Sequence, residues 1–190
     1  MKKIKKIALC ILLLIIAGAA TYGIREYFLF KEREKKYDSI ILEAAKRHNV
    51  PPTLIKAVIM RESKFQESAR GRHQEYGLMQ IREAAATDWI KALRKKEFSS
   101  FDQLLVPELN IEIGTWYLAK GLKKYQDYKY KSALALAHYN AGPGNVIKNK
   151  WVPSHKDGDV LNLITFPGTK KYIEVILKYE KEYEQKGFGK

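Results

Sequence analysis

The stretch that decides the fold is residues 54–81, LIKAVIMRESKFQESARGRHQEYGLMQI. Leu54, Val58 and Glu62 stand at positions i, i+4 and i+8, so a helix places them on one face, with Ile55 beside them. Glu62 therefore continues an apolar stripe at the end of a helix. A carboxyl group that points toward a core has a raised pKa, as a general acid requires. The other interpretation is that Glu62 only marks where the helix reaches water.

The segments on both sides of this stretch also carry helical patterns. Pro51 and Pro52 open the Leu54 helix, where a missing N–H has no cost. Asn49 and Gly142 are residue types that end helices. Further helices are expected over residues 39–49, 82–97, 107–126, 131–142 and 169–184, with a loop over 145–168. Because strand signals are poor, the sequence predicts a single all-α domain.

The expected helix over residues 107–126 has a wide apolar face. The side chains predicted to point toward the core are Leu109, Ile113, Trp116, Tyr117 and Leu118. Gly114 lies in the middle of this helix, where glycine costs roughly 1 kcal/mol relative to alanine. We therefore expect another helix to pack closely at that point.

The N-terminal segment is apolar enough to enter a membrane. Residues 7–24 carry no charged side chain, which is just long enough to span a bilayer at ~1.5 Å per residue. The lysines before it favour a cytoplasmic N-terminus and an exported remainder. A cleaved signal peptide is the alternative, because Ala17-Gly18-Ala19 is typical of a cleavage site. The aromatic residues that follow favour an uncleaved anchor. The predicted organisation is therefore an anchor or signal over 1–30, a charged linker over 31–36 and a domain over 37–186.

The net charge of +14 favours an anionic partner, such as a membrane surface or an anionic wall polymer. No arginine-rich run is present, so nucleic acid is not expected, and a solubilising lysine-rich surface explains the charge equally well. The one cysteine, Cys10, lies in the apolar N-terminal run, so no disulfide is expected in the domain. The four histidines are dispersed, and we predict neither a metal site nor a cofactor.

Four short segments carry the functional argument: Glu62-Ser63, the Gly-Leu-Met-Gln-Ile of residues 77–81, the Tyr-Asn-Ala-Gly of residues 139–142, and residues 169–172. In this order and at these separations they resemble the catalytic domain of lytic transglycosylases of the soluble Slt type, within the lysozyme-like superfamily. The stretches AVIMRESKF and PELNIEIGTWYL also resemble segments of that family. The resemblance covers roughly residues 37–180 and implies a lysozyme-like helical domain with a substrate cleft.

The chain departs from the family pattern around the Gly-Leu-Met-Gln segment. The family usually has a small residue two places before this glycine, where the chain has Glu75, followed by Tyr76. A proline usually follows the motif, where the chain has Arg82-Glu83. The loop over residues 66–76 is unusually polar. These differences leave the shape of the loop and the choice of substrate open.

The resemblance implies that Glu62 cleaves the β-1,4 bond after N-acetylmuramic acid in peptidoglycan glycan strands. Glu62 would protonate the glycosidic oxygen and then, as carboxylate, take the proton of the muramic C6 hydroxyl, giving a 1,6-anhydro product. Glycosidases normally use two carboxylates. Only Glu62 has a motif around it, and Asp88 and Asp102, the nearest other candidates, sit in no recognisable setting. The expected single carboxylate favours anhydro-sugar formation over hydrolysis.

The resemblance also implies a set of substrate-binding residues. These are Ser63, Met79, Gln80, Tyr139, Asn140 and Tyr172. Tyr172 matches a family tyrosine that approaches the catalytic acid. Structural roles remain open for Ser63 as a helix-end hydroxyl, for Met79 in core packing and for Gln80 as a partner of the backbone.

The sequence therefore predicts a peptidoglycan lytic transglycosylase that works in the cell envelope, held on the membrane by its N-terminal segment or secreted after cleavage. Two alternatives remain. One is a hydrolytic lysozyme-like muramidase, and the other is a non-catalytic peptidoglycan-binding scaffold of an envelope complex. The presence of Glu62, Gln80 and Tyr172 together argues against the scaffold.

Overall fold

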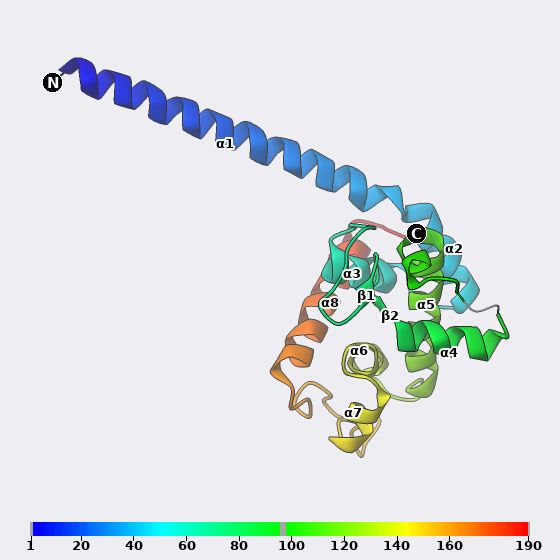
Figure 1. Ribbon diagram of the computed structural model, residues 1–190. Coiled ribbons are helices and arrows are strands. Elements are labelled where there is room, and N and C mark those ends of the chain that lie inside the picture. The colour runs from blue at the N-terminus through cyan, green and yellow to red at the C-terminus, as the bar shows by residue number, and fades with distance from the viewer. Residues whose placement is uncertain (1, 96–97, 190) are drawn as a thin grey trace. The chain divides into compact units, whose positions relative to one another are not determined.

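The structure is a computed structural model that describes residues 2–95 and 98–189 (Figure 1). The chain divides after Lys36 into two compact units. The first unit is the N-terminal helix and the second is a folded domain that begins at Tyr37.

Helix α1 (Lys2–Lys36) has exposed apolar side chains along much of its length. Leu14 is 73% exposed and Ile15 is 62% exposed. A stretch that begins at Ile11 is long and apolar enough to cross a membrane. A helix that is apolar on all sides requires an apolar environment. Both a membrane anchor and a signal sequence meet this description.

The regular secondary structure of the second unit is almost entirely helical, which confirms the predicted all-α class. Its elements follow in the order α2 (Asp38–His48), α3 (Pro52–Ser63), β1 (Glu75–Tyr76), β2 (Ile81–Arg82), α4 (Glu83–Leu93), η1 (Phe101–Leu105), α5 (Pro107–Lys124), α6 (Lys131–Ala141), α7 (Pro143–Lys148) and α8 (Pro167–Gln185). The strands β1 and β2 form a two-residue antiparallel hairpin in which Glu75 pairs with Arg82.

Helix α3 lies in the core, and α8 packs along it, as Figure 1 shows. Leu54, Ile55, Val58 and Ile59 are completely buried, so the apolar stripe read from the sequence faces the core. Helix α5 packs on α6, and the two approach closely at Gly121, where an added Cβ would lie 3.1 Å from an α6 Cα atom. These two helix pairs form the frame that holds the site.

Most helix ends follow the local chemistry. Asn49 ends α2 in the left-handed conformation with φ 53°, and Pro52 is the first residue of α3. Gly142 ends α6 at φ 82°, a backbone angle that glycine adopts without strain. Helix α7 follows at once, although a loop is predicted there, because Pro143 is well suited to the first position of a helix.

Two details of the sequence prediction are corrected. Helix α4 ends at Leu93, short of the predicted range 82–97, of which residues 96–97 lie outside the described residues. On α5, Ile113 and Leu118 are fully buried as expected, but Leu109, Trp116 and Tyr117 are only partly buried. Tyr117 lies in the wall of a cleft instead of in the core.

Candidate functional site

A cleft of about 500 Å³ lies at the end of helix α3. Glu62 contributes the α3 side of the cleft, and the hairpin contributes Glu75 and Arg82. The start of α4, Tyr117 of α5 and the end of α6 complete the lining. Segments far apart in the sequence therefore meet around one carboxyl group.

Glu62 occupies the last turn of α3, which ends at Ser63. The next two residues, Lys64 and Phe65, have left-handed φ angles of 51° and 62°. Phe65 is completely buried, which anchors the sharp turn that follows the helix. Because the helix stops there, the half-buried Glu62 side chain reaches the cleft instead of packing against a further turn.

Tyr172 of α8 holds the Glu62 carboxyl group. Its hydroxyl donates a hydrogen bond of 2.7 Å to Glu62 Oε1, and its side chain is 2% exposed. Burial raises the pKa of Tyr172 well above its usual 10, so its hydroxyl stays a donor. The Arg61 guanidinium lies 5.5 Å from the Tyr172 ring centroid. The predicted pairing of Glu62 with Tyr172 is thus present as a direct contact.

The pKa of Glu62 is raised from 4.5 to about 7, mainly because burial removes water from the carboxylate. The Tyr172 hydrogen bond and the Arg61 charge lower this pKa, and the Glu75 charge raises it. At pH 7 about half of the Glu62 groups carry a proton, against roughly 0.3% for an unshifted carboxyl group. Glu62 is therefore able to donate a proton near neutral pH.

The floor beneath the cleft is fixed by Asn110 of α5, which is completely buried. Its Oδ1 accepts a hydrogen bond of 2.7 Å from the Met79 backbone N–H. Its Nδ2 donates to the carbonyl oxygens of Tyr76 and Leu104, at 2.7 and 2.6 Å. Gly77 (φ 72°) is needed there because an added Cβ would lie 2.5 Å from Asn110 Nδ2. Asn110 thus holds the Gly-Leu-Met-Gln segment against α5.

Met79 and Ser63 do not line the cleft. Met79 is completely buried and packs on Gly114, where an added Cβ would lie 2.9 Å from its Cε atom. The close approach at Gly114 is therefore made by a loop side chain and not by the helix we expected. The Ser63 hydroxyl donates to the Ile59 carbonyl oxygen at 3.2 Å. Both residues hold structural positions here, and their contact with a substrate stays a prediction.

Gln80 links the loop to the cleft. Its Nε2 donates to the carbonyl oxygens of Gly77 and Ala69, at 2.9 and 3.2 Å, so it supports the backbone. The residue also lines the cleft. Its amide oxygen accepts no hydrogen bond within the described residues and can accept one from a ligand. From this one position Gln80 can both support the backbone and contact a substrate.

The end of α6 forms another part of the cleft lining. The Tyr139 hydroxyl donates to the Met79 carbonyl oxygen at 2.8 Å, which ties α6 to the Gly-Leu-Met-Gln segment. Asn140 is exposed, and its Oδ1 accepts a hydrogen bond of 2.8 Å from Thr169. Burial, followed by the Glu62 charge, raises the pKa of Tyr139 well above 10. Tyr139 and Asn140 both line the cleft, where a sugar could contact them.

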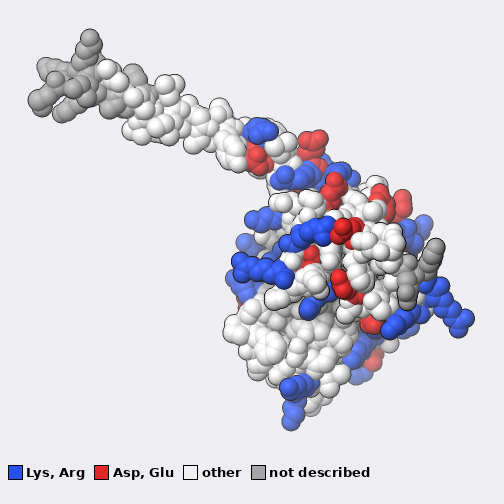
Figure 2. Space-filling model, viewed as in Figure 1, with Lys and Arg blue, Asp and Glu red and all other residues white. Residues whose placement is uncertain are grey.

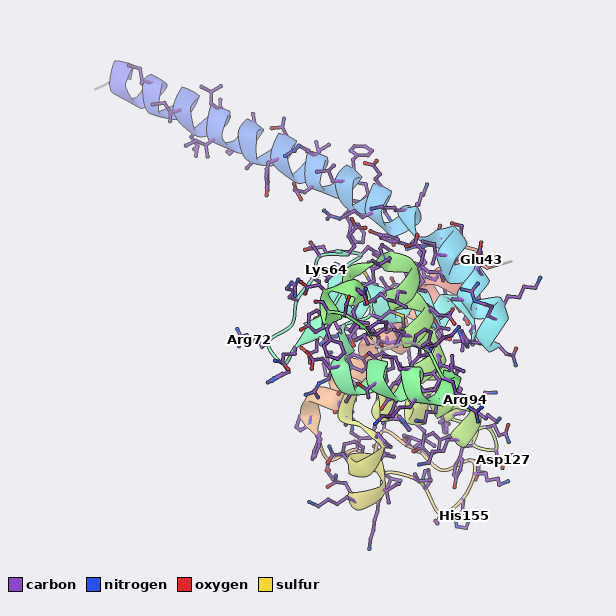
Figure 3. All side chains as sticks on the ribbon, turned by 45° about the vertical axis from the view of Figure 1, so that its right-hand side comes forward. Glu43, Lys64, Arg72, Arg94, Asp127 and His155 are labelled. Carbon is purple, nitrogen blue, oxygen red and sulfur yellow. The ribbon has the colours of Figure 1, made fainter. Side chains whose placement is uncertain are left out.

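The polar loop over residues 66–76 has a defined structure. Gly71 N–H donates to the Glu75 carbonyl oxygen, and Gly77 N–H donates to that of Ala69, each at 2.8 Å. An ion pair of 2.9 Å joins Arg70 to Asp102 of η1. Arg72 lies at the outer end of the loop (Figure 3). The departures from the family pattern therefore build one wall of the cleft.

The expectation that Glu62 is the one acid with a place in the site is wrong for this structure. Glu75 and Glu83 line the same cleft. The two acids weighed from the sequence lie elsewhere, because Asp88 contacts Lys120 at 3.4 Å and Asp102 belongs to the exposed pair with Arg70. Glu75 was missed because its neighbours in the sequence are polar and show no helical or strand period.

Asn110 is the other residue that the candidate set missed. Its signal was present, since an amide side chain interrupts the apolar face of the helix over residues 107–126. Within the described residues, no group of three or more His, Cys, Asp or Glu side chains could hold a metal ion.

Comparison with known proteins agrees with this geometry. The family model of the transglycosylase SLT domain matches residues 39–162. The soluble lytic murein transglycosylase of Escherichia coli K12 is 30% identical over 152 residues, covering 77% of this chain and 23% of that protein. The membrane-bound lytic murein transglycosylase C of Yersinia pestis is 30% identical over 172 residues, covering 81% of this chain and 48% of that protein.

Solved structures share the fold. An inactive Glu-to-Gln variant of the lytic transglycosylase Slt from Pseudomonas aeruginosa matches with a TM-score of 0.71 and 29% identity, over 82% of this chain and 25% of that one. The 70-kDa soluble lytic transglycosylase of Escherichia coli matches with a TM-score of 0.67 and 27% identity, over 78% and 24%. A complex of the 70-kDa soluble lytic transglycosylase with bulgecin A matches with a TM-score of 0.69 and 25% identity, over 88% of this chain and 27% of that one.

The chain spans less than half the length of these relatives. The shared part contains Glu62, the Gly-Leu-Met-Gln segment and the Tyr-Asn-Ala-Gly segment within the matched residues 39–162. The fold, the order of the motifs and the family match thus point the same way, and the chain belongs to the transglycosylase SLT domain family.

Proposed function

We propose that this protein is a peptidoglycan lytic transglycosylase that cleaves the β-1,4 bond between N-acetylmuramic acid and N-acetylglucosamine. The observation that carries this proposal is the Glu62 carboxyl group, half-buried in the cleft with a pKa raised to about 7 and bonded to Tyr172. Family membership supplies the substrate class, since the relatives are named murein transglycosylases.

The reaction uses Glu62 twice. Protonated Glu62 gives its proton to the glycosidic oxygen, the bond from that oxygen to the muramic C1 breaks, and N-acetylglucosamine leaves. The muramic C6 hydroxyl oxygen then bonds to C1 and passes its proton to the Glu62 carboxylate. The product is a 1,6-anhydromuramic end, and Glu62 is protonated again. The high effective concentration of an intramolecular hydroxyl makes an added water unnecessary.

The Tyr172 contact suits both steps. A hydroxyl that donates to the carboxyl group stabilises its ionised form, while burial favours the protonated form. These opposing effects keep the pKa of Glu62 near neutrality, so the group can release a proton and take one back. Gln80, Tyr139 and Asn140 are proposed to bind the sugars, because their side chains line the same cleft.

A hydrolytic muramidase is the second candidate, and one observation favours it. Glu75 and Glu83 lie in the lining with Glu62, and inverting glycosidases use a second carboxylate to activate water. The two candidates differ in their products. A hydrolase leaves reducing muramic ends, whereas the transglycosylase leaves anhydro ends.

We further propose the organisation of the chain and its location. Residues 1–30 would anchor the protein in the membrane, residues 31–36 would form a linker and residues 37–186 would form the catalytic domain in the cell envelope. The apolar α1 helix and the membrane-bound relative support an anchor. Extraction of membranes with alkaline carbonate tests this, since an anchored protein stays in the pellet and a protein released by signal cleavage does not.

The positive charge suggests contact with an anionic wall polymer or membrane surface. Figure 2 shows Lys and Arg side chains spread over the visible face of the domain with Asp and Glu among them. A dispersed pattern of this kind supports weak, salt-dependent attraction more than one dedicated binding site.

The direct test is cleavage of purified peptidoglycan by the full-length protein in detergent. The wild type is expected to release soluble muropeptides, and Glu62→Gln is expected to release none while keeping its helical content by circular dichroism. Release by a well-folded Glu62→Gln variant at the wild-type rate would overturn the assignment of Glu62. Tight binding to the wall without any release by the wild type would favour the scaffold alternative.

A further inference from the structure

Glu75 is a carboxylate in the catalytic cleft that the family pattern does not provide. It stands two places before Gly77, in strand β1 of the hairpin, and it lines the cleft together with Glu62. The loop that carries it is tied to the body of the domain by the Arg70–Asp102 ion pair and by the hydrogen bonds of Gly71 and Gly77. The backbone that carries Glu75 is therefore held in a defined wall of the cleft.

Gly71 leaves the space that the Glu75 side chain fills. An added Cβ at residue 71 would overlap Glu75 Oε2 and would lie 2.8 Å from Glu75 Cβ. It would also lie 2.7 Å from Oε1 of Gln80, so the Glu75 and Gln80 oxygens share one corner of the wall. Glycine is needed at residue 71 because of this close approach and not because of its backbone angle.

No cation neutralises Glu75 within the described part of the chain. Arg82 is its partner across the hairpin, yet no ion pair joins their side chains. The one polar contact of its carboxylate is a long one, 3.5 Å from the His73 backbone N–H to Oε2. The Glu75 carboxylate therefore keeps its acceptor capacity and its charge for whatever occupies the cleft.

The charges around Glu62 come from several elements. On α3 there is Arg61, on α8 and α6 there are the neutral hydroxyls of Tyr172 and Tyr139, and the hairpin wall supplies Glu75. The other titratable groups of the cleft lining are His73, Arg82, Glu83 and Tyr117. Among them Glu75 is the acid whose charge raises the pKa of Glu62.

We propose that Glu75 is a second catalytic carboxylate, which stabilises the positive charge that develops at the muramic C1 when Glu62 protonates the leaving oxygen. An unpaired negative charge in the cleft is stabilising where a cation forms, and a group that is already in place needs little reorganisation during the reaction. Glu75 transfers no proton and forms no bond. The same charge adds to the effect of burial, which is the main cause of the raised pKa of Glu62. This inference rests on the proposed function.

The test compares Glu75→Gln with the wild type on purified peptidoglycan, using full-length protein in detergent. We expect kcat to fall at least about tenfold with little change in KM, because the charge acts mainly on the transition state. We also expect the alkaline limb of the pH–rate profile to move to lower pH, since Glu62 loses the neighbour that favours its protonated form. The exposed Glu108→Gln, on the first turn of α5, serves as the control and should leave rate and profile unchanged.

Two further variants separate charge from structure. Glu75→Asp keeps the charge and is expected to restore the position of the alkaline limb and part of the rate. Gly71→Ala pushes the Glu75 side chain aside and is expected to lower kcat in the same direction as Glu75→Gln. The proposal is overturned if Glu75→Asp is no more active than Glu75→Gln. It is also overturned if Glu75→Gln lowers the rate without moving the alkaline limb, since the charge of Glu75 is then not what matters.

The products distinguish this proposal from its rival and from the proposed function. Anhydro ends are expected from both the wild type and Glu75→Gln. If the wild type makes reducing ends that disappear in Glu75→Gln, then Glu75 activates water and the present role is wrong. If the wild type makes anhydro ends, Glu62→Gln is inactive and Glu75→Gln equals the wild type, this inference alone fails and the proposed function stands.

Discussion

Replacing Glu62 with glutamine should make the folded domain more stable at alkaline pH, although it removes activity. Burial raises the pKa of Glu62 from 4.5 to about 7, so folding disfavours the ionised carboxylate. Glutamine has the same shape without the charge, and the Tyr172 hydroxyl can still donate to its side-chain oxygen. The variant therefore keeps the contact and loses the cost of a buried charge.

The sign and size follow from the two pKa values. Below pH 4.5 Glu62 is protonated in both the folded and the unfolded chain, so this group adds no pH dependence. Between pH 4.5 and about 7 the unfolded chain loses its proton first, and the wild type loses stability as the pH rises. Above that range the penalty reaches about 3 kcal/mol at ~1.36 kcal/mol for each pKa unit. This is an upper value, because Glu62 is not completely buried.

The assay is urea unfolding of both proteins in detergent, followed by circular dichroism at roughly pH 4.5 and pH 8.5. The free energy of unfolding of Glu62→Gln should exceed that of the wild type by about 1–3 kcal/mol more at the higher pH than at the lower one. The control is Glu174→Gln, an exposed position on α8, where the difference from wild type should not depend on pH.

A pH-independent difference between Glu62→Gln and the wild type would refute this reasoning. It would mean that the Glu62 carboxylate is as well solvated in the folded domain as in the unfolded chain. The general-acid role would then lose its physical basis, since nothing would keep Glu62 protonated near neutral pH.

Three other predictions concern the surroundings of the acid. Tyr172→Phe removes the hydrogen bond that lowers the pKa of Glu62, so the alkaline limb of the pH–rate profile should move to higher pH; an unchanged limb would contradict this. Asn110→Ala leaves one buried N–H and two carbonyl oxygens without their partner and should cost roughly 3–5 kcal/mol in urea unfolding. By contrast, Asn149→Ala, which loses one solvent-exposed hydrogen bond to the Asn145 carbonyl oxygen, should cost less than about 1 kcal/mol. Gly114→Ala drives a Cβ into the buried methionine and should cost about 1–3 kcal/mol; a neutral result would show that the floor can move.

Local patterns predicted the frame of this domain well. The apolar stripe of α3, the stop at Asn49 and the proline at the start of the helix are all short-range signals, and each is present in the structure. The resemblance predicted that Tyr172 approaches Glu62. These two residues lie far apart in the chain, and a hydrogen bond joins them in the structure. The helical period of the apolar residues and the residues at the helix ends therefore account for these helices.

The walls of the cleft could not be predicted in the same way. The place of Glu75 depends on the empty space at Gly71 and on a loop closed by backbone hydrogen bonds, and neither has a periodic signature. Tyr117 has the spacing of a core residue, but it lies where α5 passes the cleft. For Met79 the sequence left both a sugar contact and core packing open, and its burial against Gly114 depends on a contact between the loop and α5. In each case the deciding contact joins distant parts of the chain.

The central claim is that Glu62 acts as both acid and base on a glycan strand without activating water. Mass spectrometry of the soluble products from purified peptidoglycan tests this claim most directly, with wild type and Glu62→Gln side by side. The wild type is expected to release muropeptides that end in 1,6-anhydromuramic acid, lighter by one water than the hydrolysed form, and the variant is expected to release none. Reducing muramic ends alone, or anhydro ends from Glu62→Gln at the wild-type rate, would contradict it.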